Sequence, residues 1–141
     1  MKRILFLSAL IYVVFLFSVE TTYAQAEARY KAGKMIEISD LISAEETEAC
    51  TARRFVGTIA AVQYRSGKIE SFTLKSAGNS LQILFSPSLY TERLTGKDAK
   101  SLPTLVARGK KITVDTYICG ASGKIILAMY ILAGIEQNTL G

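Results

Sequence analysis

The sequence contains no histidine and no tryptophan among its 141 residues. Histidine is the commonest general base and metal ligand in proteins, and it is the side chain that titrates near physiological pH. Its absence excludes Ser-His-Asp and Cys-His nucleophilic sites, zinc-protease sites and zinc sites of the carbonic anhydrase type. We therefore expect neither a resident metal nor a cofactor.

Sequence motifs of other catalytic classes are also missing. The chain has no Ser-x-x-Lys and no Gly-x-Ser-x-Gly, and Gly67-Lys68 lacks the upstream glycine and the following Ser or Thr of a phosphate-binding loop. Carboxylates after residue 53 are dispersed, which gives neither a glycosidase pair nor a calcium loop from neighbouring positions. We predict that the protein is not an enzyme.

The N-terminus has the pattern of an export signal. Lys2 and Arg3 precede an uncharged apolar run over 4–19, and small residues follow at Thr22-Tyr23-Ala24, with a second cleavage option at Ala24-Gln25-Ala26. An uncleaved anchor is the alternative, but a helix over this run spans about 24 Å of a hydrocarbon core of about 30 Å. We expect a cleaved signal peptide over 1–24 and a periplasmic or secreted mature protein without a transmembrane segment.

The chain has two cysteines, Cys50 and Cys119, and neither follows the apolar run, which argues against a bacterial lipoprotein anchor. Disulfides persist in the compartments that exported proteins reach, so we expect one intramolecular bridge between these cysteines. Closing so long a loop contributes about 4 kcal/mol on the chain-entropy model. A pair of free thiols is the alternative.

The first part of the expected mature chain lacks a regular hydrophobic period. Residues 25–38 are polar and rich in alanine, and we interpret them as a flexible lead-in. Ser43-Ala44-Glu45-Glu46 has the Ser-x-x-Glu spacing of a capping box, which predicts a short helix within 39–49. We expect its glutamates to form a solvated face and not a metal or acid-base site.

After residue 53 the pattern becomes typical of strands, with β-branched and aromatic residues interrupted by short turns. In the first strand, Val62 shares the face of Phe55 and Ile59 if a bulge intervenes near Ala60-Ala61. The pattern predicts five strands, over residues 55–64, 69–75, 80–85, 111–119 and 124–131.

A helix is expected between the third and fourth strands, where Ser86-Pro87 begins a segment that reaches Leu94 and that Gly96 ends. This element order matches the OB-fold, a five-stranded, partly open Greek-key barrel. Its first strand pairs antiparallel with its fourth, which places Cys50 near Cys119. The predicted fold class is all-β with minor α, and the alternatives are a small β-sandwich or another five-stranded barrel.

A resemblance to a known family agrees with this fold. Several short runs resemble the start of the OB-type anticodon-binding domain of aminoacyl-tRNA synthetases: Val56-Gly57-Thr58-Ile59, Arg65-Ser66-Gly67-Lys68, Phe72, Leu74, Gly78 and Leu81-Gln82. Residues 39–135 are similar to the exported bacterial family called tRNA_anti-like, in which an acidic amphipathic helix precedes a Gly-x-Val/Ile strand and a Gly-Lys-x-Val-type strand start comes late. These features correspond to 39–49, Gly57-Thr58-Ile59 and Gly109-Lys110-Lys111-Ile112. The resemblance implies an OB-fold and supplies no catalytic residues.

Charge is unevenly distributed along the expected mature chain. Residues 25–52 carry three basic and six acidic side chains, whereas residues 53–141 carry twelve basic and five acidic ones. A basic OB barrel is typical of nucleic-acid binding, with aromatic side chains as stacking platforms. The candidate ligand-binding residues are Tyr64, Arg65, Lys68, Lys75, Gln82 and Tyr117. Short loops, few exposed aromatics and export argue against an oligonucleotide ligand.

We therefore predict an exported, non-catalytic binding module whose barrel surface contacts a protein, peptide or glycan partner of the envelope or the extracellular space. The alternative is binding of single-stranded nucleic acid through the basic barrel face. The expected organisation is a signal peptide (1–24), a flexible lead-in (25–38), an OB-fold domain with its N-terminal helix (39–135) and a C-terminal tail (136–141).

Overall fold

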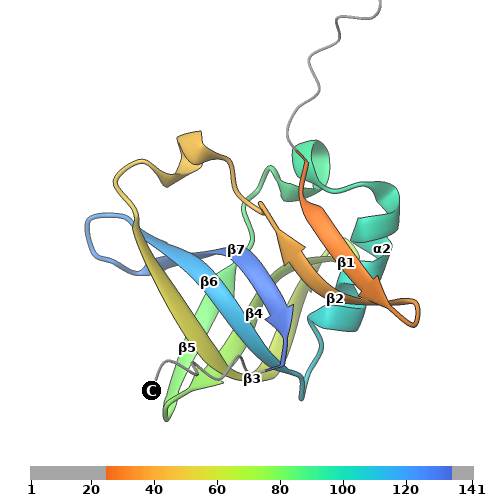
Figure 1. Cartoon of the computed structure of the whole chain (residues 1–141). Coiled ribbons are helices and arrows are strands. Elements are labelled where there is room, and N and C mark those ends of the chain that lie inside the picture. Colours follow the sequence, from red (N-terminus) through yellow and green to blue (C-terminus); the bar gives the residue numbers. More distant parts are fainter. Residues whose placement is uncertain (1–24, 135–141) are drawn as a thin grey trace, which may run out of the picture.

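The computed structural model describes residues 25–134, so the predicted signal peptide and C-terminal tail lie outside the described residues. The described chain is mostly β, with seven strands in one sheet and a single α-helix (Figure 1). Two strands that were not predicted precede the five predicted ones, all of which are present. The five predicted strands are β3 (Thr51–Arg65), β4 (Lys68–Ser76), β5 (Asn79–Leu84), β6 (Lys111–Cys119) and β7 (Ile125–Ala133).

These five strands curve into a partial ring. Strand β3 pairs antiparallel with both β4 and β6, β4 pairs antiparallel with β5, and β6 pairs antiparallel with β7. Strands β5 and β7 meet in parallel at Leu84 and Leu127. The ring therefore has one weak seam, between β5 and β7.

The predicted bulge in the first strand of the ring is confirmed. The register between β3 and β4 shifts between Ile59 and Ala61, which lets Ala60 drop out of the pairing. Ile59 is buried, and Val62 packs against the same core. The bulge thus restores the inward face after one extra residue.

The prediction of a flexible lead-in over 25–38 was wrong. This segment forms a hairpin of β1 (Glu27–Lys31) and β2 (Lys34–Ser39), and β2 pairs with β7 at Ile38 and Ile131. The turn residues Ala32 and Gly33 both have positive φ, as a two-residue type I′ hairpin turn requires. The polar composition of β1 reflects its position at the edge of the sheet.

The predicted helix within 39–49 is reduced to one short 3-10 turn, η1 (Ala44–Thr47). The backbone N–H of Ser43 donates to Glu46 Oε2 at 3.2 Å. The other oxygen of Glu46 accepts hydrogen bonds from the hydroxyls of Ser86 and Ser88. These contacts fix the segment as a loop ahead of Cys50, where an amphipathic helix was expected.

The helix between the third and fourth strands of the ring is displaced along the chain from its predicted position. The predicted segment contains one π-helical turn, η2 (Leu89–Arg93), and the main helix is α2 (Gly96–Leu105). The Thr95 side chain caps α2 by accepting a hydrogen bond from the Asp98 N–H at 3.1 Å. Gly96 was expected to end the helix over 86–94, and it is instead the first residue of α2.

The predicted disulfide is confirmed, because Cys50 and Cys119 are bonded with their Cα atoms 4.4 Å apart. The bridge joins the residue before β3 to the last residue of β6, beside the pair formed by Thr51 and Ile118. It therefore fastens together two strands that also pair along their length.

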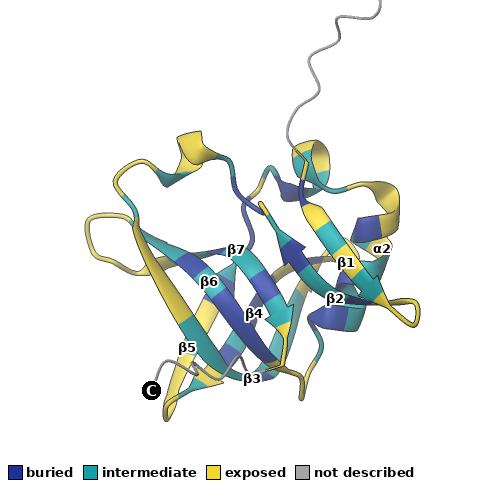
Figure 2. Ribbon diagram, viewed as in Figure 1, coloured by how far each residue is buried: buried dark blue, intermediate teal, exposed yellow. Residues whose placement is uncertain are grey.

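One hydrophobic core fills the space between the ring, β2 and α2 (Figure 2). Phe72 and Phe85 meet in it with ring centroids 5.8 Å apart. The β1–β2 hairpin is fastened to α2, since the Met35 N–H donates to Thr104 Oγ1 at 3.0 Å and the Tyr30 hydroxyl donates to Asp98. Helix α2 and the hairpin thus cover one side of the ring. On the opposite side, the side chains of the ring strands are not covered by the helix or the hairpin.

Candidate functional site

Three of the predicted ligand-binding residues lie together at the β3–β4 hairpin. Arg65 pairs with Lys68 in register, and Tyr64 is 55% exposed. Arg65 Nε lies 3.3 Å from Glu70 Oε1, and Lys68 Nζ lies 5.4 Å from the Tyr90 ring centroid. The two cations of this hairpin therefore already have partners within the chain.

Gln82 belongs to a chain of polar side chains on the outer face of β3, β4 and β5. Gln82 Nε2 donates to Ser71 Oγ at 3.2 Å, and Ser71 Oγ donates to Gln63 Oε1 at 3.0 Å. Gln63 Nε2 in turn lies 3.3 Å from Thr73 Oγ1. These hydrogen bonds occupy the amide and hydroxyl groups that would otherwise bind a ligand on this face. A ligand would therefore have to compete with them.

The remaining predicted residues are separated from these. Lys75 is exposed near the end of β4, and Tyr117 lies on β6, where it packs against the hydrophobic core. Strand β3 lies between β4 and β6. The structure thus distributes the six predicted residues over the hairpin, the β4–β5 face and β6, without gathering them into one cluster.

A hollow of about 310 Å³ opens at the side of the ring that lies away from α2. Its apolar lining comes from four different strands, which contribute Phe55, Leu81, Ile118 and Ile126, all half-buried. The turn between β4 and β5 and the loop between β6 and β7 flank this side (Figure 1). We call this hollow, with its lining residues, the mouth.

The mouth exists because β5 and β7 diverge. The two strands pair at Leu84 and Leu127. Among the described residues, β4 is the one partner of residues 79–83 of β5, and β6 is the one partner of Ile125 and Ile126 of β7. An unpaired strand edge offers backbone N–H and C=O groups to another extended chain. The mouth therefore combines an apolar lining with two free strand edges.

Arg53 supplies a positive charge at the rim of the mouth. Its guanidinium Cζ lies 5.0 Å from the centroid of the Phe55 ring, and the side chain is exposed. Within residues 25–134 it forms no ion pair. By contrast the adjacent Arg54 binds Asp115 through Nε and a second guanidinium nitrogen, at 2.6 and 3.0 Å. Arg53 is thus a rim cation available to a carboxylate.

A second hollow, of about 250 Å³, has a mixed polar and apolar lining that includes Asp40, Met129 and the paired Arg54 and Asp115. It lies beside the Arg54–Asp115 pair and Tyr130, whose hydroxyl donates to Glu37 Oε2 at 2.6 Å. The hydrogen bonds from Tyr130 and then Arg29 hold the pKa of Glu37 below its usual value. These contacts join β1, β2, β3, β6 and β7 on the outer face, which is a structural role.

Two further findings bear on the possible chemistry of the described residues. They contain no group of three or more Cys, Asp or Glu side chains arranged to hold a metal ion. They also contain no helix that is long and apolar enough to span a bilayer.

Comparison with known protein families, with curated proteins and with solved structures found no match for this chain.

The alternating pattern of their strands predicts that Phe55, Leu81 and Ile118 face inward, and it does not predict the mouth. Their alternation with polar neighbours is the same as that of fully buried residues such as Ile83. The difference depends on how far β5 and β7 diverge at the seam. That divergence is a property of strands far apart in sequence and leaves no local pattern.

Proposed function

We propose that the protein is an exported, non-catalytic binding module built on an OB-type barrel, and that its mouth binds an extended peptide segment. The ring order β3-β4-β5-β7-β6, with one parallel pair between β5 and β7, supports the OB assignment. The disulfide is compatible with an exported protein. Membership of the tRNA_anti-like family remains part of this proposal.

The observation that carries the proposal is the coincidence of three features in one place. The mouth has an apolar lining from Phe55, Leu81, Ile118 and Ile126, it borders unpaired edges of β5 and β7, and Arg53 stands at its rim. An extended peptide uses all three, since its backbone pairs with a strand edge while alternate side chains enter a pocket. A glycan would leave the apolar lining without a partner.

The chemistry of the ligand follows from the lining. An aliphatic side chain fits into a hollow of this size and contacts its apolar lining, and a carboxylate next to it in the peptide reaches the Arg53 guanidinium. The proposed ligand is therefore an extended segment of a partner protein in which an aliphatic residue stands beside Asp or Glu. Single-stranded nucleic acid has weaker support, because the chain of Gln63, Ser71 and Gln82 is already hydrogen-bonded internally.

The test is selection of displayed random peptides on the oxidised protein, followed by affinity measurement with the selected peptides. We expect enrichment of an aliphatic residue adjacent to an acidic one. Leu81→Asp and Arg53→Glu should each weaken binding by about tenfold or more, as loss of an anchor contact does. Lys100→Glu is the control, because it makes the same charge change as Arg53→Glu on an exposed part of α2.

Failure to select any peptide, or selected peptides whose affinity survives both substitutions, would contradict the proposal. Titration with a single-stranded oligonucleotide examines the alternative. If the oligonucleotide binds and the peptides do not, with affinity falling steeply as salt rises, the nucleic-acid function is correct and the peptide function is wrong.

A further inference from the structure

A row of basic side chains crosses one end of the sheet. Thr58 of β3 pairs with Lys111 of β6 on one side and with Lys75 of β4 on the other. Register partners point to the same face of a sheet, and neighbouring strands lie about 4.8 Å apart. The Cα atoms of the two lysines therefore lie about 10 Å apart across Thr58.

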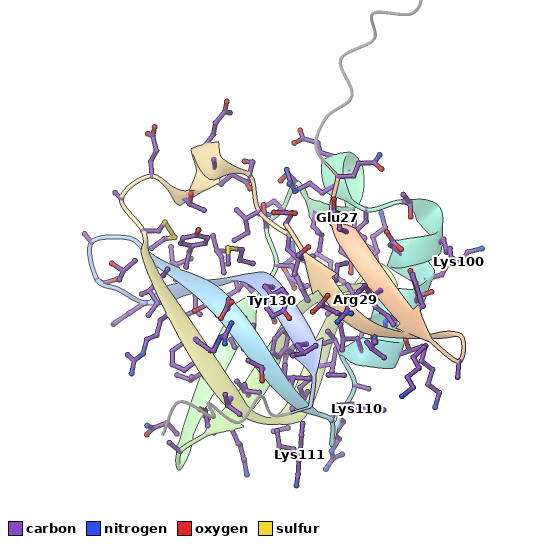
Figure 3. The ribbon with its side chains drawn as sticks, viewed as in Figure 1. Glu27, Arg29, Lys100, Lys110, Lys111 and Tyr130 are labelled. Atoms are coloured by element: carbon purple, nitrogen blue, oxygen red, sulfur yellow. A yellow bond between two sulfur atoms is a disulfide. The ribbon has the colours of Figure 1, made fainter. Side chains whose placement is uncertain are left out.

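The loop between α2 and β6 extends this row. The Ile59 N–H donates to the Lys110 carbonyl at 2.9 Å, and the Gly109 N–H donates to the Ile59 carbonyl at 2.8 Å. These bonds hold Arg108 and Lys110 beside β3, next to Lys111. In Figure 3, Lys110 and Lys111 both lie at the lower end of the molecule.

The turn of the β1–β2 hairpin adds Lys31 and Lys34. The Met35 N–H donates to Thr104 Oγ1, which places Lys34 beside the last turn of α2, shortly before Arg108 in the chain. Strand β2 also lies beside the last residues of β7, whose Ala133 pairs with Ile112. We call the six cations Lys31, Lys34, Lys75, Arg108, Lys110 and Lys111 the basic end.

The charges of the basic end are not neutralised within the described part of the chain. None of its six side chains takes part in an ion pair there. The glutamates of η1 and its flanks, Glu45, Glu46 and Glu48, lie at the opposite, upper end in Figure 1. The glutamates of η1 and its flanks therefore lie away from the basic end.

We propose that the basic end docks the protein onto an anionic lipid surface. Its cations come from three separate segments, the β1–β2 turn, the α2–β6 loop and the end of β4, so they form a broad face for phosphate headgroups. Nucleic-acid binding uses aromatic platforms for successive bases, and among the described residues Tyr64 is the one exposed large aromatic. The basic end offers charge without a series of stacking surfaces.

The basic end adjoins the mouth at Lys75, because the β4–β5 turn that follows Lys75 contributes Ser76, Ala77 and Asn79 to the lining of the mouth. In Figure 1 the β6–β7 loop on the far side of the mouth lies at the left and α2 lies at the right, whereas in Figure 3 Lys110 and Lys111 lie at the lower end. A protein attached through Lys110 and Lys111 therefore keeps the β6–β7 side of the mouth away from the lipid surface. The inference stands on the charge distribution and does not depend on the peptide-binding proposal.

The test is cosedimentation of the oxidised protein with vesicles of phosphatidylcholine, with or without phosphatidylglycerol, at low and physiological salt. We expect binding to the phosphatidylglycerol vesicles that falls as salt rises, and little binding to pure phosphatidylcholine. Lys110→Glu/Lys111→Glu should weaken binding by at least about 30-fold, since each basic residue near such a surface contributes about fivefold. Lys34→Glu/Lys75→Glu repeats the test with different side chains of the same end.

Lys100→Glu/Lys124→Glu is the matched control, because it makes an equal change of net charge at exposed positions on α2 and in the β6–β7 loop. It should retain most of the binding. The proposal is overturned if the anionic vesicles do not bind, or if the control weakens binding as much as the basic-end variants do. It is also overturned if a single-stranded oligonucleotide binds the same residues more tightly than the vesicles at equal salt.

Discussion

Gly57 of β3 lies directly against the carbonyl oxygen of Lys75 in β4, so close that a Cβ atom at position 57 would stand 2.1 Å from that oxygen. Beside this contact, Ser76 Oγ donates a hydrogen bond to the Val56 carbonyl at 2.7 Å. The ring bends at this point, and β3 passes from β6 toward β4 without room for a side chain. The φ of Gly57 is not positive, so its backbone conformation does not require glycine. Glycine is required because a side chain at this position has no room.

Gly57→Ala should therefore destabilise the fold. The atom in the way belongs to the backbone, so one strand must move, and overpacking of this kind costs about 1–3 kcal/mol. Urea unfolding measures the loss. Gly96→Ala is the control, because no atom lies within 4 Å of its added Cβ and alanine favours helices. An alanine at 57 that unfolds at the wild-type midpoint would contradict the close packing.

Removal of the disulfide should lower stability substantially while leaving the fold recognisable. The Cys50→Ser/Cys119→Ser variant loses a bridge across 69 residues, for which about 2–5 kcal/mol is typical. Strands β3 and β6 still pair from Thr51 to Thr58, so circular dichroism should keep its β signature. Equal midpoints for oxidised and reduced wild-type protein in urea would show that the bridge contributes nothing.

The Glu37 carboxylate should make stability fall at acid pH. Hydrogen bonds from Tyr130 and then Arg29 lower its pKa in the folded protein below the reference value of 4.5. A carboxyl group whose pKa is lower in the folded than in the unfolded protein stabilises the fold at pH values above the unfolded pKa. This stabilisation is lost as the pH falls through the folded pKa. Because the Arg29 partner is exposed to solvent, which screens the ion pair, we expect Glu37 to contribute less than about 1 kcal/mol.

Unfolding in urea across the range from pH 7 to pH 3 checks this expectation. Glu37→Gln should be less stable than the wild type at pH 7, and the difference should shrink toward pH 3. Glu45→Gln, which alters an exposed side chain of η1, should follow the wild type throughout. A Glu37→Gln deficit that does not change with pH would rule out the carboxylate charge as its cause.

The open mouth predicts unequal costs for two similar truncations in β5. Ile83 is fully buried, so Ile83→Ala should cost about 2–5 kcal/mol. Leu81 is half-buried and lines the mouth, so Leu81→Ala removes less apolar contact and should cost clearly less. Similar losses of unfolding free energy for the two variants would mean that the mouth is closed in solution.

Much of the ring could be predicted from the sequence because local patterns determine it. Alternating residues such as Ile112 and Val114 mark inward faces, and the five expected strands are present with shifts at their ends. The disulfide was predictable because an exported chain with two cysteines favours a bridge, and the expected pairing of the first and fourth strands agreed with it. These inferences use periods and pairings that a single sequence contains.

The errors arose where tertiary contacts outweigh local composition. The β1–β2 hairpin is polar at the sheet edge, and its Ala32-Gly33 turn, between Tyr30 and Met35, was a usable signal that was missed. Helix α2 was missed because Gly96 was expected to end the helical segment that starts at Ser86-Pro87. Burial of Leu102 and Leu105 compensates for the N–H that Pro103 lacks.

The mouth and the basic end have different origins in the sequence. The excess of basic residues after position 53 was visible, but its collection at one end depends on register, as with Lys75 and Lys111 across Thr58. The mouth depends on the divergence of β5 from β7, which no local pattern encodes. Candidate residues chosen by type and strand position therefore fell on several surfaces.

The most direct test of the peptide-binding account is the position of a bound peptide on the oxidised protein, measured by backbone amide chemical-shift changes on titration with a selected peptide. The account predicts that the largest changes lie in residues 79–83 of β5, at Ile125 and Ile126 of β7 and around Phe55. Largest changes instead at Gln63, Ser71 and Gln82, with the mouth unaffected, would contradict it.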